Sequence, residues 1–107
     1  MRKRRDFLAA NRGARAPTQG FVLLMRARRD DSDVVRVGFT VTKKIGNAVV
    51  RNKLKRRLRA LSAAILPDRA PPGTDIVLIG RNGALTRSFA DMERDLAKAV
   101  GRAAKSL

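Results

Sequence analysis

The sequence contains no cysteine and no histidine among its 107 residues. Without cysteine the chain can form no disulfide, no thiolate metal site and no thiol nucleophile, which fits a reducing compartment. The absence of histidine removes the commonest metal ligand and the usual proton shuttle near neutral pH. We therefore expect no catalytic residue in the protein and no metal held by the protein alone.

Aromatic residues are also scarce, with four Phe and no Tyr or Trp. Because aromatic rings are the common means of gripping unpaired bases, base stacking by this chain is limited. Phe39 and Phe89 fall on faces predicted to be buried, and Phe21 begins a predicted strand. Phe7 is the one reasonable stacking candidate, although its periodicity is more typical of a core residue.

Long apolar runs are missing. The apolar stretch at residues 7–10 is far shorter than the central region of a signal peptide, and no run approaches the roughly 18 residues of a membrane-spanning helix. The hydrophobic fraction of 44% is nevertheless too high for a disordered basic tail. We expect a single cytoplasmic domain over residues 1–107, with a modest core and no membrane contact.

Acidic residues are few, since 9 Asp and Glu stand against 25 Lys and Arg, giving a formal net charge of +16. Positive side chains in this number repel one another in the compact chain, so we expect a polyanionic partner. RNA or DNA is the first candidate, and an anionic membrane surface is the second. No acidic residue lies between Asp33 and Asp68. That window holds nine cations: Arg36, Lys43, Lys44, Arg51, Lys53, Lys55, Arg56, Arg57 and Arg59.

Hydrophobic periodicity predicts an α+β fold in which helices cover one mixed sheet. In the clearest strand, 34–42, valines and Phe39 alternate with Arg36, Gly38 and Thr40, so one face packs and the other is free for a ligand. The predicted elements are a helix at 3–12 ended by Gly13, strands at 21–27, 34–42 and 75–79, a helix at 48–66 stopped by Pro67, and a last helix capped by Ser88.

The helix at 48–66 begins after Asn47 and carries an apolar stripe on one side. Lys55, Arg56 and Arg59 lie opposite that stripe, which is the pattern of a nucleic-acid interface rather than of a solvated face with interspersed acids. Asn52 on the same side could bond a ribose or phosphate oxygen, or be merely solvated. Gly38 either lets a nucleic-acid backbone approach its strand or marks a bulge.

The stretch RVGFTVTKKIGNAVVRNKLKRRLRA, residues 36–60, resembles the signature of the bacterial ribonuclease P protein family. The flanking segments fit as well, so the resemblance covers almost the whole chain. It implies an α/β sandwich with a left-handed βαβ crossover, a topology shared with a ribosomal protein domain. It also implies a partner, the catalytic ribonuclease P RNA, which holds the active site with Mg²⁺ and removes the 5′ leader from precursor tRNA.

Carried over by position, the resemblance implies two sets of binding residues and no obligate protein partner. The set for the RNA subunit is Lys43, Lys44, Arg51, Asn52, Lys53, Lys55, Arg56 and Arg59. The set for a cleft that receives the leader is Phe7, Asn11, Leu24, Arg36, Gly38 and Thr40. Lys53 replaces the usual arginine, which makes phosphate geometry less strictly fixed. Asn11 and Leu24 stand where relatives often carry aromatics, so we expect a weaker leader grip.

Two other classes of function compete with this reading. The first is a ribosomal or RNA-chaperone protein that uses the same basic helix without any associated cleavage. The second is a self-contained nuclease using Mg²⁺ and the acidic turn of Asp30, Asp31 and Asp33, which the scattered placement of the remaining acids disfavours.

Overall fold

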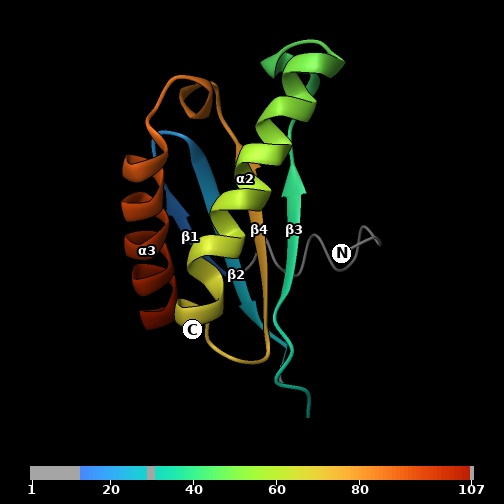
Figure 1. Cartoon of the computed structure of the whole chain (residues 1–107). Helices are drawn as coiled ribbons and strands as arrows, with labels where there is room; N and C mark the ends of the chain where they lie inside the picture. Colours follow the sequence, from blue (N-terminus) through green and yellow to red (C-terminus); the bar gives the residue numbers. More distant parts are fainter. Residues whose placement is uncertain (1–12, 29–30, 107) are drawn as a thin grey trace.

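The computed structural model describes residues 13–28 and 31–106, which form a four-stranded sheet with two helices (Figure 1). The strands lie in the order β1-β2-β4-β3. Their bounds are Ala14–Pro17 for β1, Phe21–Ala27 for β2, Arg36–Thr40 for β3 and Thr74–Gly80 for β4. The helices are α2 at Ala48–Arg69 and α3 at Phe89–Lys105, and two short 3-10 turns are η1 at Lys43–Ile45 and η2 at Asn82–Leu85.

The sheet is mixed, because β2 runs antiparallel to both β1 and β4 while β3 runs parallel to β4. Helix α2 connects β3 to β4. In Figure 1, with α2 toward the viewer and the two parallel strands pointing up, β4 lies to the left of β3. This crossover is left-handed, the rare hand for such connections. The α+β fold and its crossover are confirmed.

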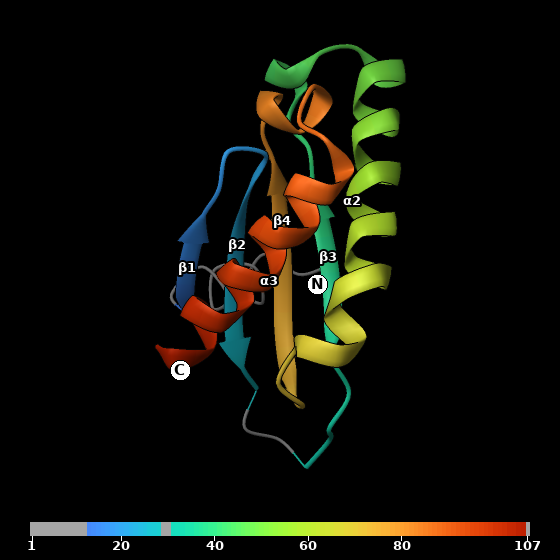
Figure 2. The ribbon, with the colours of Figure 1, turned by 60° about the vertical axis from the view of Figure 1, so that its left-hand side comes forward.

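Both helices pack on one face of the sheet (Figure 2), and the main core lies between the helices and the sheet. Alternate strand residues point into it, among them Phe21, Leu23 and Met25 of β2, all completely buried. The apolar stripe of α2 faces the same core through Leu54, Leu58 and Leu61. Gly80 allows the close approach of α2, because a Cβ there would lie 2.9 Å from Leu54 Cδ2.

The opposite side of the sheet, here called the distal face, is built from the other strand residues. Three rows of side chains cross it from β2 through β4 to β3: Arg26, Asp75 and Arg36; Leu24, Val77 and Gly38; Val22, Ile79 and Thr40. The alternation predicted for β3 therefore holds, since Val37 and Phe39 pack on the core side. The distal face is apolar over two rows and charged at the row nearest the start of β3.

Both predicted helix caps are confirmed. The Asn47 side chain accepts a hydrogen bond of 3.0 Å from the Val50 amide, and the Ser88 hydroxyl accepts one of 3.1 Å from the Asp91 amide. Each cap satisfies an amide that lacks a partner within its helix. Over residues 13–28 and 31–106, no helix is both long enough and apolar enough to cross a membrane.

The elements predicted from the sequence differ from the structure in several places. Pro67 does not stop α2, which continues to Arg69 because the Ala70 amide still donates to the Leu66 carbonyl. Strand β3 covers Arg36–Thr40 rather than 34–42. Strand β1 was not foreseen, because ARAP has small residues and a proline, the composition of a loop; it is an edge strand, where proline is tolerated.

Gly13 was assigned the wrong role. Its φ angle is not positive, so it is no left-handed helix cap. A Cβ at this position would lie within van der Waals radii of the Met25 carbonyl oxygen, so glycine is required for the close approach of the chain to β2. The helix predicted at residues 3–12 lies outside the described residues.

Candidate nucleic-acid interface

The outward side of α2 gathers most of the residues predicted to bind RNA. Arg56 and Arg59 are exposed, and a surface hollow of about 450 Å³ is formed between them and their neighbours. The hollow is lined by Val49, Asn52, Lys55, Arg56 and Arg59. Four of these five residues belong to the set predicted for the RNA subunit, so the helix does bring them together.

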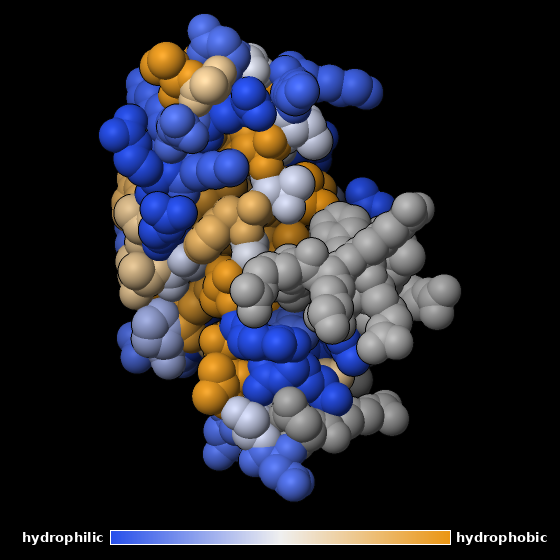
Figure 3. All heavy atoms as spheres, turned by 90° about the vertical axis from the view of Figure 1, so that its right-hand side faces the viewer, coloured by the Kyte–Doolittle hydropathy of each residue, from blue (hydrophilic) through white to orange (hydrophobic). Residues whose placement is uncertain are grey.

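The remaining members of that set extend the same basic surface toward the start of α2. Lys43 and Lys44 are exposed on η1, directly before the helix, and Lys53 is exposed on α2 while Arg51 is half-buried. Figure 3 looks onto the β3 edge and shows hydrophilic residues gathered at the end of the molecule that carries η1 and the start of α2. We call the eight predicted residues on η1 and α2 the helix surface.

Arg59 is oriented by an aromatic ring. Its guanidinium carbon lies 6.0 Å from the centroid of the Phe39 ring on β3, within the range of a cation–π contact. Phe39 is only partly buried and packs against the core with its neighbours. The ring therefore restricts the conformations of Arg59 and leaves its guanidinium at the surface.

Arg57 has a different role from its cationic neighbours. Its NH1 donates to the Ala84 carbonyl at 2.6 Å and its NH2 to the Arg87 carbonyl at 2.8 Å. These bonds fasten α2 to η2 and the loop that follows it. Sequence periodicity placed Arg57 on the flank of the basic surface, and no local signal separates this fastening arginine from those that face outward.

Residues of the predicted leader cleft lie together on the distal face. Arg36 and Thr40 flank Gly38 on β3, and Leu24 lies in the same row as Gly38 across Val77. Leu24 is only 1% exposed, so Arg36, Gly38 and Thr40 provide the accessible part of this set. Phe7 and Asn11, the other two predicted residues, lie outside the described residues.

The structure decides between the two interpretations of Gly38. The pairing of β3 with β4 is regular from Arg36 to Thr40, so the glycine marks no bulge. Among residues 13–28 and 31–106, a Cβ at Gly38 would meet Val77 Cγ2 at 3.9 Å, which is an ordinary contact. Packing against the described residues does not require glycine here, and the absence of a side chain exposes more of the β3 backbone on the distal face than another residue would.

Asp75 forms the charged centre of the distal face and was not predicted as a functional residue. It is completely buried, and Arg36 binds it in a bidentate manner, with Nε to Oδ1 and NH2 to Oδ2 both at 2.7 Å. Arg28 NH1 donates to Oδ1 at 3.2 Å. Burial raises the pKa of the Asp75 carboxyl, but the hydrogen bonds and positive charges of Arg36 and Arg28 outweigh burial and hold this pKa below its ordinary value.

A sequence signal for this ion-pair network does exist. Asp75 opens an apolar run, DIVLI, that reads as a buried strand, and a carboxylate on such a strand needs a cationic partner. The partner is found only through strand pairing, because Arg36 lies 39 residues away.

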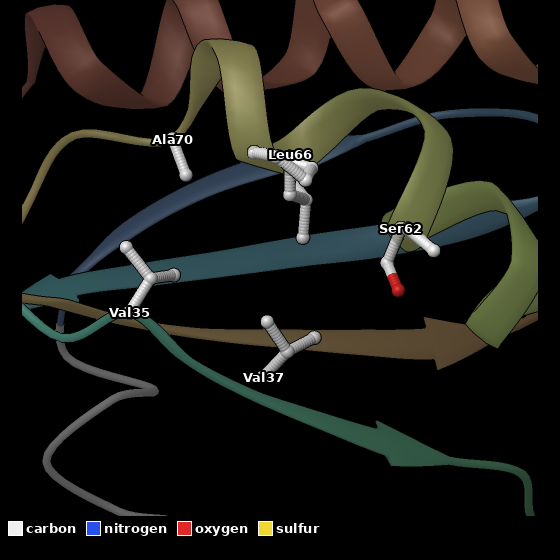
Figure 4. Close-up of a pocket in the computed structure, with 7 residues that line it drawn as sticks. Val35, Val37, Ser62, Leu66 and Ala70 are labelled. Atoms are coloured by element: carbon white, nitrogen blue, oxygen red, sulfur yellow. The ribbon is translucent and has the colours of Figure 1, made fainter.

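An apolar pocket of about 280 Å³ lies between β3 and the second half of α2 (Figure 4). The Val35 and Val37 side chains point toward Leu66 and Ala70 across it. Its lining consists of Val35, Val37, Ser62, Ala63, Leu66, Pro67 and Ala70. With no charged group in that lining, the pocket offers nothing that binds a polyanion.

The acidic turn does not assemble a metal site in the described part of the chain. Asp31 and Asp33 are exposed, and Asp30 lies outside the described residues. No group of three Asp or Glu side chains with metal-binding spacing is found among residues 13–28 and 31–106.

Fold and charge together define a class: a basic α+β protein with a cationic helix, the charge pattern of nucleic-acid-binding proteins. Comparison with known proteins gives the family. The ribonuclease P family model matches residues 1–104. The ribonuclease P protein component of Erythrobacter litoralis is 50% identical over 103 residues, which are 96% of this chain and 84% of that protein. The component of Gluconacetobacter diazotrophicus is 48% identical over 104 residues, 96% and 89% of the two chains.

Solved structures agree. The ribonuclease P protein from Thermotoga maritima superposes with a TM-score of 0.78 at 33% identity, covering 95% of this chain and 94% of that one. The chain belongs to the bacterial ribonuclease P protein family. It is an RNA-binding subunit of the endonuclease that matures the 5′ end of tRNA, and it works with an RNA subunit. Family membership decides against the ribosomal and RNA-chaperone alternative.

Proposed function

We propose that the chain binds RNA on two separate surfaces, the catalytic RNA subunit on the helix surface and the 5′ leader of precursor tRNA on the distal face. The observation that carries this proposal is the position of the two surfaces. The helix surface lies on the outer side of α2, which packs on one face of the sheet, and Arg36, Gly38 and Thr40 lie on the other face. The sheet separates them.

The charge pattern of α2 supports the first half of the proposal. Arg51 with Lys55, and Lys55 with Arg59, are like-charged pairs four residues apart, each costing a few tenths of a kcal/mol when nothing neutralises them. No acid lies on α2 before Asp68. A phosphate backbone supplies the missing negative charge, and such contacts position a protein on RNA without reading its sequence.

The shape of the distal face supports the second half. Gly38 leaves the β3 backbone open, Thr40 offers a hydroxyl beside it, and Arg36 offers a guanidinium whose side chain is 48% exposed. This combination of a cation, a hydroxyl and accessible backbone suits a single strand, whose sugar and phosphate groups need several weak contacts.

The chemistry of cleavage belongs to the RNA subunit in this proposal. Mg²⁺ is bound mainly by that RNA, and the protein contributes binding of the leader and neutralisation of phosphate charge, without an obligate protein partner. The site of action is the cytoplasm, in keeping with the absence of cysteine from the sequence.

A charge reversal on the distal face tests the leader assignment. In the assembled holoenzyme, Thr40→Glu should lower the affinity for precursor tRNA, because the new carboxylate repels leader phosphates, and should leave affinity for mature tRNA unchanged. Thr86→Glu, at an exposed residue beside η2, is the matched control for added charge. Equal affinities of the Thr40→Glu and Thr86→Glu holoenzymes for precursor tRNA would refute the assignment.

A further inference from the structure

In the charged row of the distal face, several described arginines gather around one described carboxylate, that of Asp75. Strand pairing places Arg26 of β2 and Arg36 of β3 on either side of Asp75 of β4, and Arg28 reaches the same carboxylate. Three guanidinium groups therefore surround one buried carboxylate. Among these four described side chains there are three positive charges and one negative charge.

Of the three arginines, Arg26 is the one that makes no hydrogen bond to the Asp75 carboxylate in the described structure. Asp75 Oδ1 already accepts from Arg36 Nε and Arg28 NH1, and Oδ2 accepts from Arg36 NH2. Arg26 NH1 lies 3.9 Å from Oδ2, beyond hydrogen-bond distance. Within the described part of the chain its guanidinium donates no hydrogen bond, and the side chain is 32% exposed.

The row is continuous with the surface proposed for the leader. Arg36 lies four residues before Thr40 on β3, which is about 13 Å along an extended strand, with the open backbone of Gly38 between them. Figure 3 shows a second hydrophilic group at the end of the molecule where β3 begins, separated by apolar residues from the group at the opposite end. The charged row is thus distinct from the helix surface.

We propose that Arg26, together with the half-exposed Arg36 that Asp75 holds, forms a binding site for an RNA phosphodiester at the end of the distal face, while Arg28, whose side chain is only 6% exposed, helps to hold Asp75 beneath it. Asp75 keeps Arg36 and Arg28 in one geometry, so little side-chain freedom is lost when an anion binds. The planar fork of Arg26 matches two phosphate oxygens, and its positive charge favours an anionic ligand over a neutral one. The assignment to the leader rests on the proposed function, and the RNA subunit is the other source of the same chemical group.

Arg26→Gln is the informative variant, because it removes the charge without breaking a hydrogen bond of the described structure. Arg26→Lys keeps the charge and loses the fork. Arg102→Gln, at an exposed residue on α3, is the matched control for lowering the net charge by one. All three proteins should melt within a few degrees of the parent protein, which shows that the variants fold.

The experiment measures affinities of each holoenzyme for precursor and mature tRNA, and of each protein for the RNA subunit, over a range of salt concentrations. For a leader phosphodiester, Arg26→Gln should weaken precursor binding roughly 5- to 20-fold relative to Arg102→Gln and reduce the salt slope by about one unit, with mature tRNA unaffected. Arg26→Lys should give an intermediate loss. A fall in affinity for the RNA subunit instead would place the same phosphodiester site on that RNA.

If Arg26→Gln matches Arg102→Gln in all three affinities, there is no phosphodiester site at Arg26 and the row serves only to hold Asp75. Failure of the underlying leader assignment has a different signature. In that case the Thr40→Glu and Thr86→Glu holoenzymes would bind precursor tRNA with equal affinity, whatever residue stands at position 26.

Discussion

At the scale of single residues, Asp75 shows how one buried charge fixes the arginines of the distal face. Its carboxylate is completely buried and fixes Arg36 and Arg28. A carboxylate in the first position of an apolar strand is visible in the sequence, but its partners depend on which strands pair and in which register. Sequence reasoning placed Arg36 on the correct face and could not find Arg26 and Arg28 beside it.

Asp75→Asn should therefore destabilise the protein by about 3 to 5 kcal/mol, because the substitution leaves the surrounding guanidinium groups without their counter-charge. Urea unfolding at neutral pH measures this change. Asp68→Asn is the matched control, since Asp68 is exposed near the end of α2, and it should change stability by less than about 0.5 kcal/mol. Equal stabilities of the two variants would contradict the role given to Asp75.

The lowered pKa of Asp75 also predicts a pH dependence. The stabilisation by the ionised carboxylate is complete above the unfolded-state pKa of about 3.9 and is lost as the pH falls through the lower folded-state pKa. The stability difference between the parent protein and Asp75→Asn should thus narrow below about pH 4. The hydrogen bond from Arg94 also lowers the pKa of Asp91, but that group is common to both proteins and cancels. A difference independent of pH would contradict the ionised state of Asp75.

At the scale of elements, α2 was the best predicted part of the chain. Its start, cap, apolar stripe and basic outer side all follow from local rules of capping and periodicity. Its end was not predictable, because whether a proline stops a helix or lies within its last turn depends on surrounding packing. The role of Arg57 was hidden for the same reason, since its partners Ala84 and Arg87 lie about 30 residues along the chain.

The arginines of α2 should separate into two phenotypes. Arg56→Ala with Arg59→Ala should weaken binding to the RNA subunit and lower the salt slope by about two units, one for each lost phosphate contact, with little effect on stability. Arg57→Ala should instead cost about 1.5 to 3 kcal/mol of stability, the scale of hydrogen bonds from a charged group, and leave the slope unchanged. Salt titrations and urea unfolding of both variants check this, and an exchange of the two phenotypes would contradict the assignment of surfaces.

At the scale of the whole molecule, a small apolar core must stabilise a chain with a net charge of +16. The fold class and the basic outer side of α2 were predictable because charge segregation and hydrophobic periodicity are local in sequence. Strand β1 and the Asp75 network were not, since both exist only through pairing with β2 and β4. These two features therefore depend on contacts between strands that are far apart in the sequence.

The isolated protein should be only marginally stable at low ionic strength and should gain from sulfate, because anions that bind the native state stabilise it by mass action. The measurement is the melting temperature at tens of millimolar sulfate, compared with sodium chloride at the same ionic strength. A rise in sulfate beyond that in chloride is expected. A melting temperature indifferent to sulfate would mean that the basic surfaces form no anion sites.

The most direct test of the account is cleavage of precursor tRNA by the protein alone, by a bacterial ribonuclease P RNA alone, and by the two together at low Mg²⁺. We expect no cleavage by the protein, weak cleavage by the RNA, and markedly faster cleavage by the combination, because the protein supplies phosphate neutralisation and leader binding that the RNA otherwise obtains from Mg²⁺. Cleavage by the protein without RNA, or an RNA activity unchanged by the protein, would contradict it.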